Sequence, residues 1–392
     1  MHQLGNLIKH ELIDNLTSGR YILTSIVCIV LCVISIVLMS HDYQHREKES
    51  NVARGISRPP QPLSLIANGT NEVRPVIPNS HPRYNVIGQV FMRFGEERHI
   101  FELFETPDFV YIVSIVLSVL TIFLSYDSIC GEKETHTLSL VLSNSLRRST
   151  VLLGKWIGGY ISLLLSFSPA VLLIVIYMYT FSGVSLSSEH FLRLGGIICF
   201  TFIYLSVFFT LGLLVSTVVH REATSLVLCL FIWMIWTLWI PRLALLTTRT
   251  IAPAPSEGEH RQMKEQVVTE HDITEEQREI LWSMDDAYIS KIDRQIALGK
   301  NLSRLSPLAS YVHGSTTLAQ TGIPDYQDYR RRFFAWLKRN VRQEGQWDMF
   351  VHRPQPLERS FSAVWIDLQL LLLWNVLLFM GANLAFHRYD VR

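Results

Sequence analysis

The sequence is poor in charge and in cysteine. Asp, Glu, Lys and Arg make up 18% of its 392 residues, whereas 49% are hydrophobic and the mean hydropathy is +0.23. This balance is typical of a membrane protein. A net charge of +1 gives no overall attraction to nucleic acid. The five cysteines lie in apolar segments or in the segment 127–155, so the two long polar regions cannot be held together by disulfides.

The sequence also lacks the nucleotide-binding motif of an ATPase. A phosphate-binding loop of the form G-x-x-x-x-G-K-[ST] does not occur, because Gly154-Lys155 is followed by Trp156 and Gly299-Lys300 by Asn301. If the protein depends on ATP, the nucleotide and its Mg²⁺ must be held by another subunit.

Neither a metal site nor a catalytic site is predicted. His41 and His45 would share one helix face, but two ligands fall short of the roughly four that a closed metal site needs. The stretch 183–185 resembles the serine motif of rhomboid-like intramembrane proteases. However, no histidine lies in the middle of a span to act as its base.

Six segments are apolar and long enough to cross a membrane, which takes roughly 20 residues. They are 21–40, 109–126, three spans within 156–245 (156–181, 195–219 and 225–245) and 362–386. Residues 1–20 carry leucines and isoleucine at near-helical spacing, which favours an interfacial helix over a frayed polar tail. The predicted fold is an all-α membrane protein with six transmembrane helices, an N-terminal interfacial helix and a largely helical extracytoplasmic region.

Lys and Arg in the short connections indicate the orientation, because positive residues are retained on the cytoplasmic side. The segment 127–155, both termini and the tail 387–392 are then cytoplasmic, and 41–108 and 246–361 lie outside. We expect a multi-pass protein of a bacterial inner (plasma) membrane. Trp236, Trp239 and Trp365 would lie near the outer interface and Trp156 near the inner one, where amphipathic rings prefer to be.

The two outer regions have different patterns. Residues 41–108 are rich in proline, which predicts a loop-rich structure rather than a helix. Within 246–361, apolar residues recur at helical spacing from Leu281 to Ile296 and again from Tyr326 to Val341. We therefore expect two amphipathic helices separated by a loop, forming either a docking platform for an extracytoplasmic protein or a solvated structural pair.

The segment 127–155 is a charged stretch between two spans. Its acidic start, apolar middle and basic Arg147 and Arg148 fit a helix-turn-helix at the membrane surface, with the arginines available to lipid phosphates or to an acidic groove of a partner. An ordinary positively charged connector fits equally well.

This segment resembles the intracellular signature of ABC-2 type transporter permeases. In that family an acidic residue ends the second span and is followed by a G-E-K-E run, T-L, S-N, an arginine and G-K. The matching residues are Asp127, Gly131, Glu132, Lys133, Glu134, Thr137, Leu138, Leu142, Ser143, Asn144, Arg148, Gly154 and Lys155. His136 stands where a glycine is common and Ser145 where a proline is common.

The resemblance implies that 127–155 docks onto a separate ABC ATPase, present in two copies, which holds ATP and Mg²⁺. It also implies a second permease, either a copy of this chain or a homologue. The chain would couple ATP hydrolysis to export or to conformational work. The alternatives are a mechanotransmitter that acts on an extracytoplasmic partner without moving cargo and a non-transporting receptor or scaffold. The cargo stays open.

Polar residues within the spans gather in the sixth, at Asp367, Gln369 and Asn375. Asp367 is close enough to the outer surface to be hydrated. The deeper Asn375 should face protein or a polar path, because an unpaired amide facing lipid costs several kcal/mol. Of these two, a hydrogen bond between helices is favoured over contact with a substrate.

Overall fold

The computed structural model describes residues 2–52, 60–69, 107–138, 147–180, 186–267, 274–342, 350–351 and 353–388. Within these ranges the regular secondary structure is helical and contains no strand. The predicted all-α fold is confirmed.

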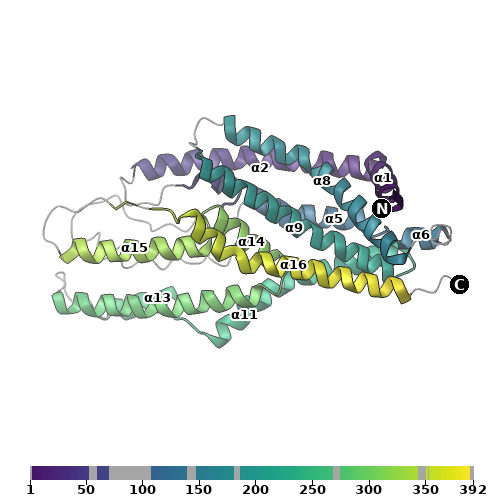
Figure 1. The fold of residues 1–392 in the computed structure, drawn as a ribbon. Helices are drawn as coiled ribbons and strands as arrows, with labels where there is room; N and C mark the ends of the chain where they lie inside the picture. Colours follow the sequence, from purple (N-terminus) through teal and green to yellow (C-terminus); the bar gives the residue numbers. More distant parts are fainter. Residues whose placement is uncertain are drawn as a thin grey trace.

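Six helices in the described part of the chain are long and apolar enough to cross a membrane, and each overlaps one of the predicted spans. They run side by side in one bundle (Figure 1). In chain order they are α2 (Gly19–Val52); α4 (Phe109–Ile112), η4 (Val113–Leu117) and α5 (Ser118–Ser125) in series; α8 (Arg148–Thr180); α9 (Ser188–Val218); α10 (Glu222–Met234), η5 (Ile235–Trp239) and α11 (Ile240–Ile251) in series; and α16 (Leu357–Arg388).

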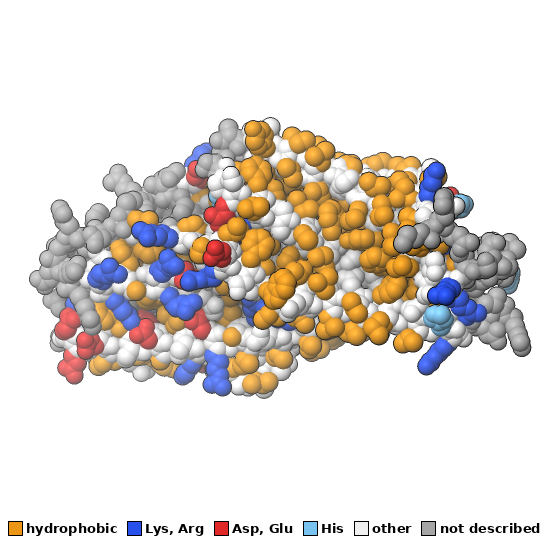
Figure 2. Space-filling view, in the orientation of Figure 1, with side chains coloured by type: hydrophobic (Ala, Val, Ile, Leu, Met, Phe, Trp, Pro, Cys, Tyr) orange, Lys and Arg blue, Asp and Glu red, His pale blue; other side chains and the backbone are white. Residues whose placement is uncertain are grey.

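The remaining helices lie at the two ends of this bundle. One end, which we call the near end, lies at the right in Figure 1 and carries α1 (His2–Thr17) and α6 (Cys130–Glu134), together with the C-terminal end of α16. The opposite end, which we call the far end, carries η1 (Pro62–Leu65), α12 (Glu257–Glu265), α13 (Glu275–Ser303), α14 (Pro307–Leu318) and α15 (Ile323–Arg342). Figure 2 shows hydrophobic side chains covering the middle of the molecule on this face, with charged side chains at both ends.

Helix α9 forms the centre of the bundle. It packs against α5, α10, α14 and α16, whereas α8 packs mainly against α1 and α2. Phe208, Phe209 and Tyr204 of α9 are almost fully buried. Large buried aromatic side chains supply much of the packing in such a core. The fourth span therefore connects most of the others.

The helices of the far end differ in one respect from the predicted pair of amphipathic helices separated by a loop. The two amphipathic helices are present as α13 and α15, and their predicted apolar stripes are largely buried, as at Leu281 and Phe333. They are separated by a helix rather than by a loop. All twelve residues of α14 are buried, because it lies against α9, α16 and η5. At twelve residues α14 is too short to be recognised as a span.

A second correction concerns residues 41–52. They were expected to belong to a loop-rich region, but α2 continues through them to Val52. This stretch contains no proline, and Arg46 pairs with Asp42 one turn earlier at 2.7 Å. Such pairs four residues apart support a helix.

Arg193 joins the far end to the spans. Its side chain is fully buried at the start of α9. Its guanidinium donates hydrogen bonds to the carbonyls of Leu318 (3.2 Å) and Gln355 (2.8 Å) and to the Ser360 hydroxyl (2.9 Å). Glu189 balances its charge at 2.7 Å. This one side chain therefore ties α9 to the end of α14 and the start of α16.

Candidate functional site

The residues of the charged segment gather at the near end, beginning with a turn at 126–129 that follows α5. The Ser216 hydroxyl of α9 accepts the amide N–H groups of Ile129 and Cys130, both at 2.8 Å. Ser225 of α10 donates to the Tyr126 carbonyl at 2.6 Å. The turn that starts the segment is thus anchored to the fourth and fifth spans.

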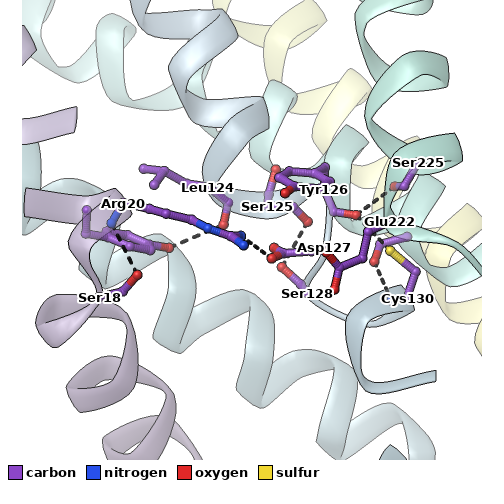
Figure 3. A network of polar contacts seen from close by, with 12 residues as sticks. Ser18, Arg20, Leu124, Ser125, Tyr126, Asp127, Ser128, Cys130, Glu222 and Ser225 are labelled. Carbon is purple, nitrogen blue, oxygen red and sulfur yellow. Dashed lines mark hydrogen bonds and ion pairs between the residues drawn. The ribbon is translucent and has the colours of Figure 1, made fainter. Parts of the chain in front are cut away.

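Asp127 connects this turn to the first span. Its carboxylate forms an ion pair with Arg20 at the start of α2, and the Arg20 guanidinium lies 5.7 Å from the centre of the Tyr126 ring. Figure 3 shows Arg20 extending across from α2 to Asp127, with Glu222 of α10 on the far side of the turn. Because both partners are partly exposed, this pair orients the turn more than it stabilises the fold.

Lys133 and Glu134 of α6 bind two neighbouring helix ends. The Lys133 ammonium donates to the carbonyls of Ser216 (3.3 Å), Thr217 (2.5 Å) and Val219 (3.1 Å), which end α9. The Glu134 carboxylate accepts the N–H of Glu222, which begins α10, at 3.0 Å. Each charge suits the dipole of the helix end that it contacts. The successive charges of the G-E-K-E run therefore hold the connection between the fourth and fifth spans.

Glu132 faces the other way, toward the third span. It pairs with Lys155 of α8 at 2.8 Å, and Lys155 also pairs with Glu11 of α1 at 3.3 Å. The Lys155 side chain is 6% exposed. One buried cation thus joins α1, α6 and α8.

Two glycines let α1 lie close against α8. A Cβ at Gly158 would come 2.8 Å from Cβ of Glu11 and 3.2 Å from the Ile8 carbonyl oxygen, and a Cβ at Gly154 would collide with the Leu7 side chain. Small residues permit such close approach of helices. The predicted interfacial helix is therefore docked on the third span at the level of Lys155.

The turn after α6 has the backbone that a glycine prefers. His136, which stands where the resembling permeases commonly have glycine, has a φ of 57°. This left-handed conformation is unfavourable for residues that carry a Cβ. His136 therefore holds a backbone conformation that glycine would adopt at a lower cost.

The described part of the segment divides into buried and exposed residues. Leu138 packs in a cluster with Ile129, Leu213 and Phe386, and Arg148 donates to the carbonyls of Phe386 (3.3 Å) and His387 (3.1 Å) at the end of α16. The exposed residues form the tip of the segment, which we define as Glu134, Thr135, His136, Thr137 and Arg147. Asn144, Leu142, Ser143 and Ser145 lie outside the described residues.

The structure also shows what surrounds the three polar residues of the sixth span. Asp367 was expected to be hydrated, but it is fully buried and accepts two hydrogen bonds from Arg304, at 2.7 and 2.9 Å. Burial at the junction with α13 and α14 makes a cationic partner necessary there. Asn375 accepts from Ser206 (2.9 Å) of α9, which is a hydrogen bond between helices. Gln369 is exposed.

Most partners of the predicted site residues were not found from the sequence. Lys155 and Glu11 are 144 positions apart, and no sequence pattern links the two. The sequence does mark Glu11 itself as unusual, because it follows Leu7 by four residues and Ile8 by three and so falls on the apolar face of the helix. It therefore interrupts the apolar stripe of α1, and a charge on such a face predicts a buried partner of opposite sign.

These features define a multi-pass membrane protein in which the ends of all six spans meet one polar segment, directly or through a neighbouring helix. Among protein families, the one described as ABC-2 family transporter protein matches residues 5–391. The chain belongs to this family, so the inferred resemblance is confirmed and the protein is a transmembrane permease component. A search of curated proteins finds no match.

Proposed function

We propose that this chain is the permease subunit of an ABC transporter and that the segment 127–155 transmits the motion of a separate ATPase to the spans. The main observation behind this proposal is that the segment has an exposed tip and a second set of residues that contact the spans. Its tip is exposed, and its buried and partly buried residues contact the ends of α1, α8, α9 and α16. Glu134 of the tip itself accepts the N–H group that begins α10. A displacement of the tip would therefore act on several spans together.

The partners follow from this role. Because the chain carries no phosphate-binding loop, ATP and Mg²⁺ would be bound by the ATPase, which we expect in two copies. A second permease, identical or homologous, would complete the membrane path. The near end would be cytoplasmic and the far end extracytoplasmic in a bacterial inner membrane, as the excess of Lys and Arg in the short near-end connections favours.

The work performed is export of a cargo or conformational work on an extracytoplasmic protein. The second possibility is supported by the connection between the far end and the spans through Arg193 and the Arg304–Asp367 pair. Motion of α9 and α16 would thus move α14 and α13. If the tip of the segment 127–155 and the far end are coupled through these helices, binding at either of them should change the affinity of the other by the same factor at equilibrium.

Site-directed cross-linking tests the proposal. Four of the five cysteines are buried and Cys199 is exposed, so a Cys199→Ser background allows a single reactive cysteine. Thr137→Cys in the tip should cross-link to the co-expressed ATPase, and the extent should change with nucleotide. Ser290→Cys, exposed on α13 at the far end, is the matched control and should not react. Absence of any Thr137→Cys product in every nucleotide state would contradict the proposal.

Purification from the native membrane tests the partners. Mild detergent extraction followed by mass spectrometry should recover a stoichiometric ATPase with vanadate-sensitive turnover. An additional extracytoplasmic protein in the complex would favour the mechanical role, whereas stimulation of the ATPase by a soluble or lipid cargo would favour export. A chain recovered alone and inactive in several detergents would instead favour a scaffold.

A further inference from the structure

The fifth span is longer than a membrane requires. From Glu222 to Ile251 it has 30 residues, whereas about 20 residues cross the roughly 30 Å of hydrocarbon. Counting about 20 residues from Glu222 reaches Arg242. Counting about 20 residues backward along α16 from His387 reaches Asp367, close to Trp365. The two counts place the far boundary of the membrane at the level of Arg242 and Asp367, which is near the start of α11.

Helix α11 turns away from the bundle at this boundary. Figure 1 shows it diverging to the side, while α13 begins farther out and runs back toward the bundle past α11. It follows a π-helical stretch, η5, and has Pro241 in its first turn. Both features are common causes of a bend in a helix. The last twelve residues of this long helix therefore leave the direction of the span where the hydrocarbon ends.

The side of α11 that faces away from the protein carries an apolar stripe. Trp239 at the end of η5 is 57% exposed, and Leu243 and Leu246 of α11 are 51% and 58% exposed. At 3.6 residues per turn they form one stripe. Ala244 and Thr248 lie on the opposite side and are buried, and α11 packs against α13. Leu243 and Leu246 lie past the counted boundary, and an exposed apolar stripe of this kind marks a surface that contacts something apolar.

Two arginines border this stripe. Arg242 and Arg249 are seven residues apart, so they lie on the same side of the helix, next to Leu246. Both are exposed. Among the residues that the structure describes, neither has an ion-pair partner. An apolar stripe bordered by arginines is the pattern of a helix that lies in a membrane interface.

We propose that α11 lies in the headgroup region of the far leaflet, with its apolar stripe among the upper acyl chains and with Arg242 and Arg249 bound to phospholipid phosphates. Guanidinium groups suit phosphate because they can donate two parallel hydrogen bonds. A second copy of the chain fits less well. Packing α11 on α11 about a two-fold axis brings the same patch to both sides, so arginines would gather at the contact without carboxylates.

Fluorescence quenching in vesicles tests the position of α11. In the full-length Cys199→Ser chain, Leu246→Cys carries an environment-sensitive dye, and Ile280→Cys, exposed on α13, is the matched control. The dye at 246 should be quenched by lipids spin-labelled near the headgroup and protected from aqueous iodide, and the dye at 280 should show the reverse. Quenching at 246 by iodide would overturn the proposal. Protection from both quenchers would also overturn it, because a second protein surface would then cover the stripe.

Vesicle composition tests the arginines. With equal mole fractions of spin-labelled phosphatidylglycerol and phosphatidylcholine, the dye at 246 should report a preference of roughly fivefold for the anionic lipid. Arg242→Gln with Arg249→Gln should abolish this preference while the protection from iodide persists. Arg331→Gln with Arg339→Gln, two exposed arginines of α15, should leave it unchanged. An unchanged preference in the Arg242/Arg249 variant would overturn the headgroup assignment.

Discussion

Lys155 in the third span and Glu132 in α6 form an ion pair of 2.8 Å, and the same ammonium contacts Glu11 of α1 at 3.3 Å. Two carboxylates from different helices thus share one buried cation. Removing that cation leaves two like charges close together with little water to separate them. Lys155 is therefore a residue on which the contact of α1 and α6 with the third span depends.

We predict that Lys155→Met lowers the free energy of unfolding by about 3 kcal/mol, because it leaves both carboxylates without their cation. Denaturant titration in detergent, followed by tryptophan fluorescence, measures the change. Lys9→Met, an exposed lysine of α1, is the control and should change stability by less than about 0.5 kcal/mol. A Lys155→Met protein as stable as Lys9→Met would show that the pair is unimportant to the fold.

Adding Glu132→Gln and Glu11→Gln to Lys155→Met should restore most of the lost stability. Replacing a whole buried charge group by neutral residues is often close to neutral, whereas removing one partner is not. If this group transmits motion, the triple variant should fold and still fail to couple, with ATPase stimulation reduced relative to wild type. A triple variant with full coupling would mean that α1 and α6 communicate by another route.

His136→Gly should stabilise the turn that follows α6. With a φ of 57°, His136 occupies a conformation that costs about 1 kcal/mol or more for a residue with a Cβ and little for glycine. Thermal unfolding should therefore show a gain of about 0.5–1 kcal/mol. His136→Ala is the matched control, since alanine carries a Cβ, and it should bring no gain. Equal stabilities of the Gly and Ala variants would rule out a strained backbone.

The secondary structure of this protein could largely be predicted from its sequence, because spans and amphipathic helices repeat over many residues. The stripes of α13 and α15 show this, as Leu281 and Phe333 are buried where the periodicity places them. The site could be predicted only in part. The family motif identifies Glu132, Lys133 and Lys155, but their partners Glu11 and Ser216 lie outside it on other helices, and pairings across such separations leave no periodic signal.

The Arg304–Asp367 pair allows a comparison of a buried and an exposed ion pair. Asp367 is fully buried, whereas the Asp286 side chain, which pairs with Lys338, is 63% exposed. Asp367→Asn should lower the free energy of unfolding by about 3 kcal/mol or more, because it leaves Arg304 without its counter-charge. Asp286→Asn should lower it by less than about 1 kcal/mol. Denaturant titration of the two variants measures the difference, and equal losses would contradict the assigned burial.

The last prediction concerns pH and His313 of α14. Its imidazole is buried and shares a hydrogen bond of 3.1 Å with Ser303. Burial, reinforced by the nearby Lys300 and Arg304, lowers the pKa of His313 from 6.5 to about 3.

Above pH 6.5 the imidazole is neutral in the folded and unfolded chain, so it adds no pH dependence. As the pH falls below 6.5, the unfolded chain binds a proton that the folded chain excludes until about pH 3. Stability should therefore fall by about 1.4 kcal/mol per pH unit in this window, or about 2 kcal/mol at pH 5.

His313→Gln isolates this effect, because glutamine does not titrate. Asp108 acts in the opposite direction, since burial raises its pKa to about 6 and its protonation below that pH favours the folded chain. The informative quantity is thus the difference between wild type and His313→Gln at each pH. That difference should change by about 2 kcal/mol in the direction of a less stable wild type between pH 7.5 and pH 5. A constant difference between wild type and His313→Gln would mean that the folded chain accepts the proton, and α14 would then be accessible to water at the far end.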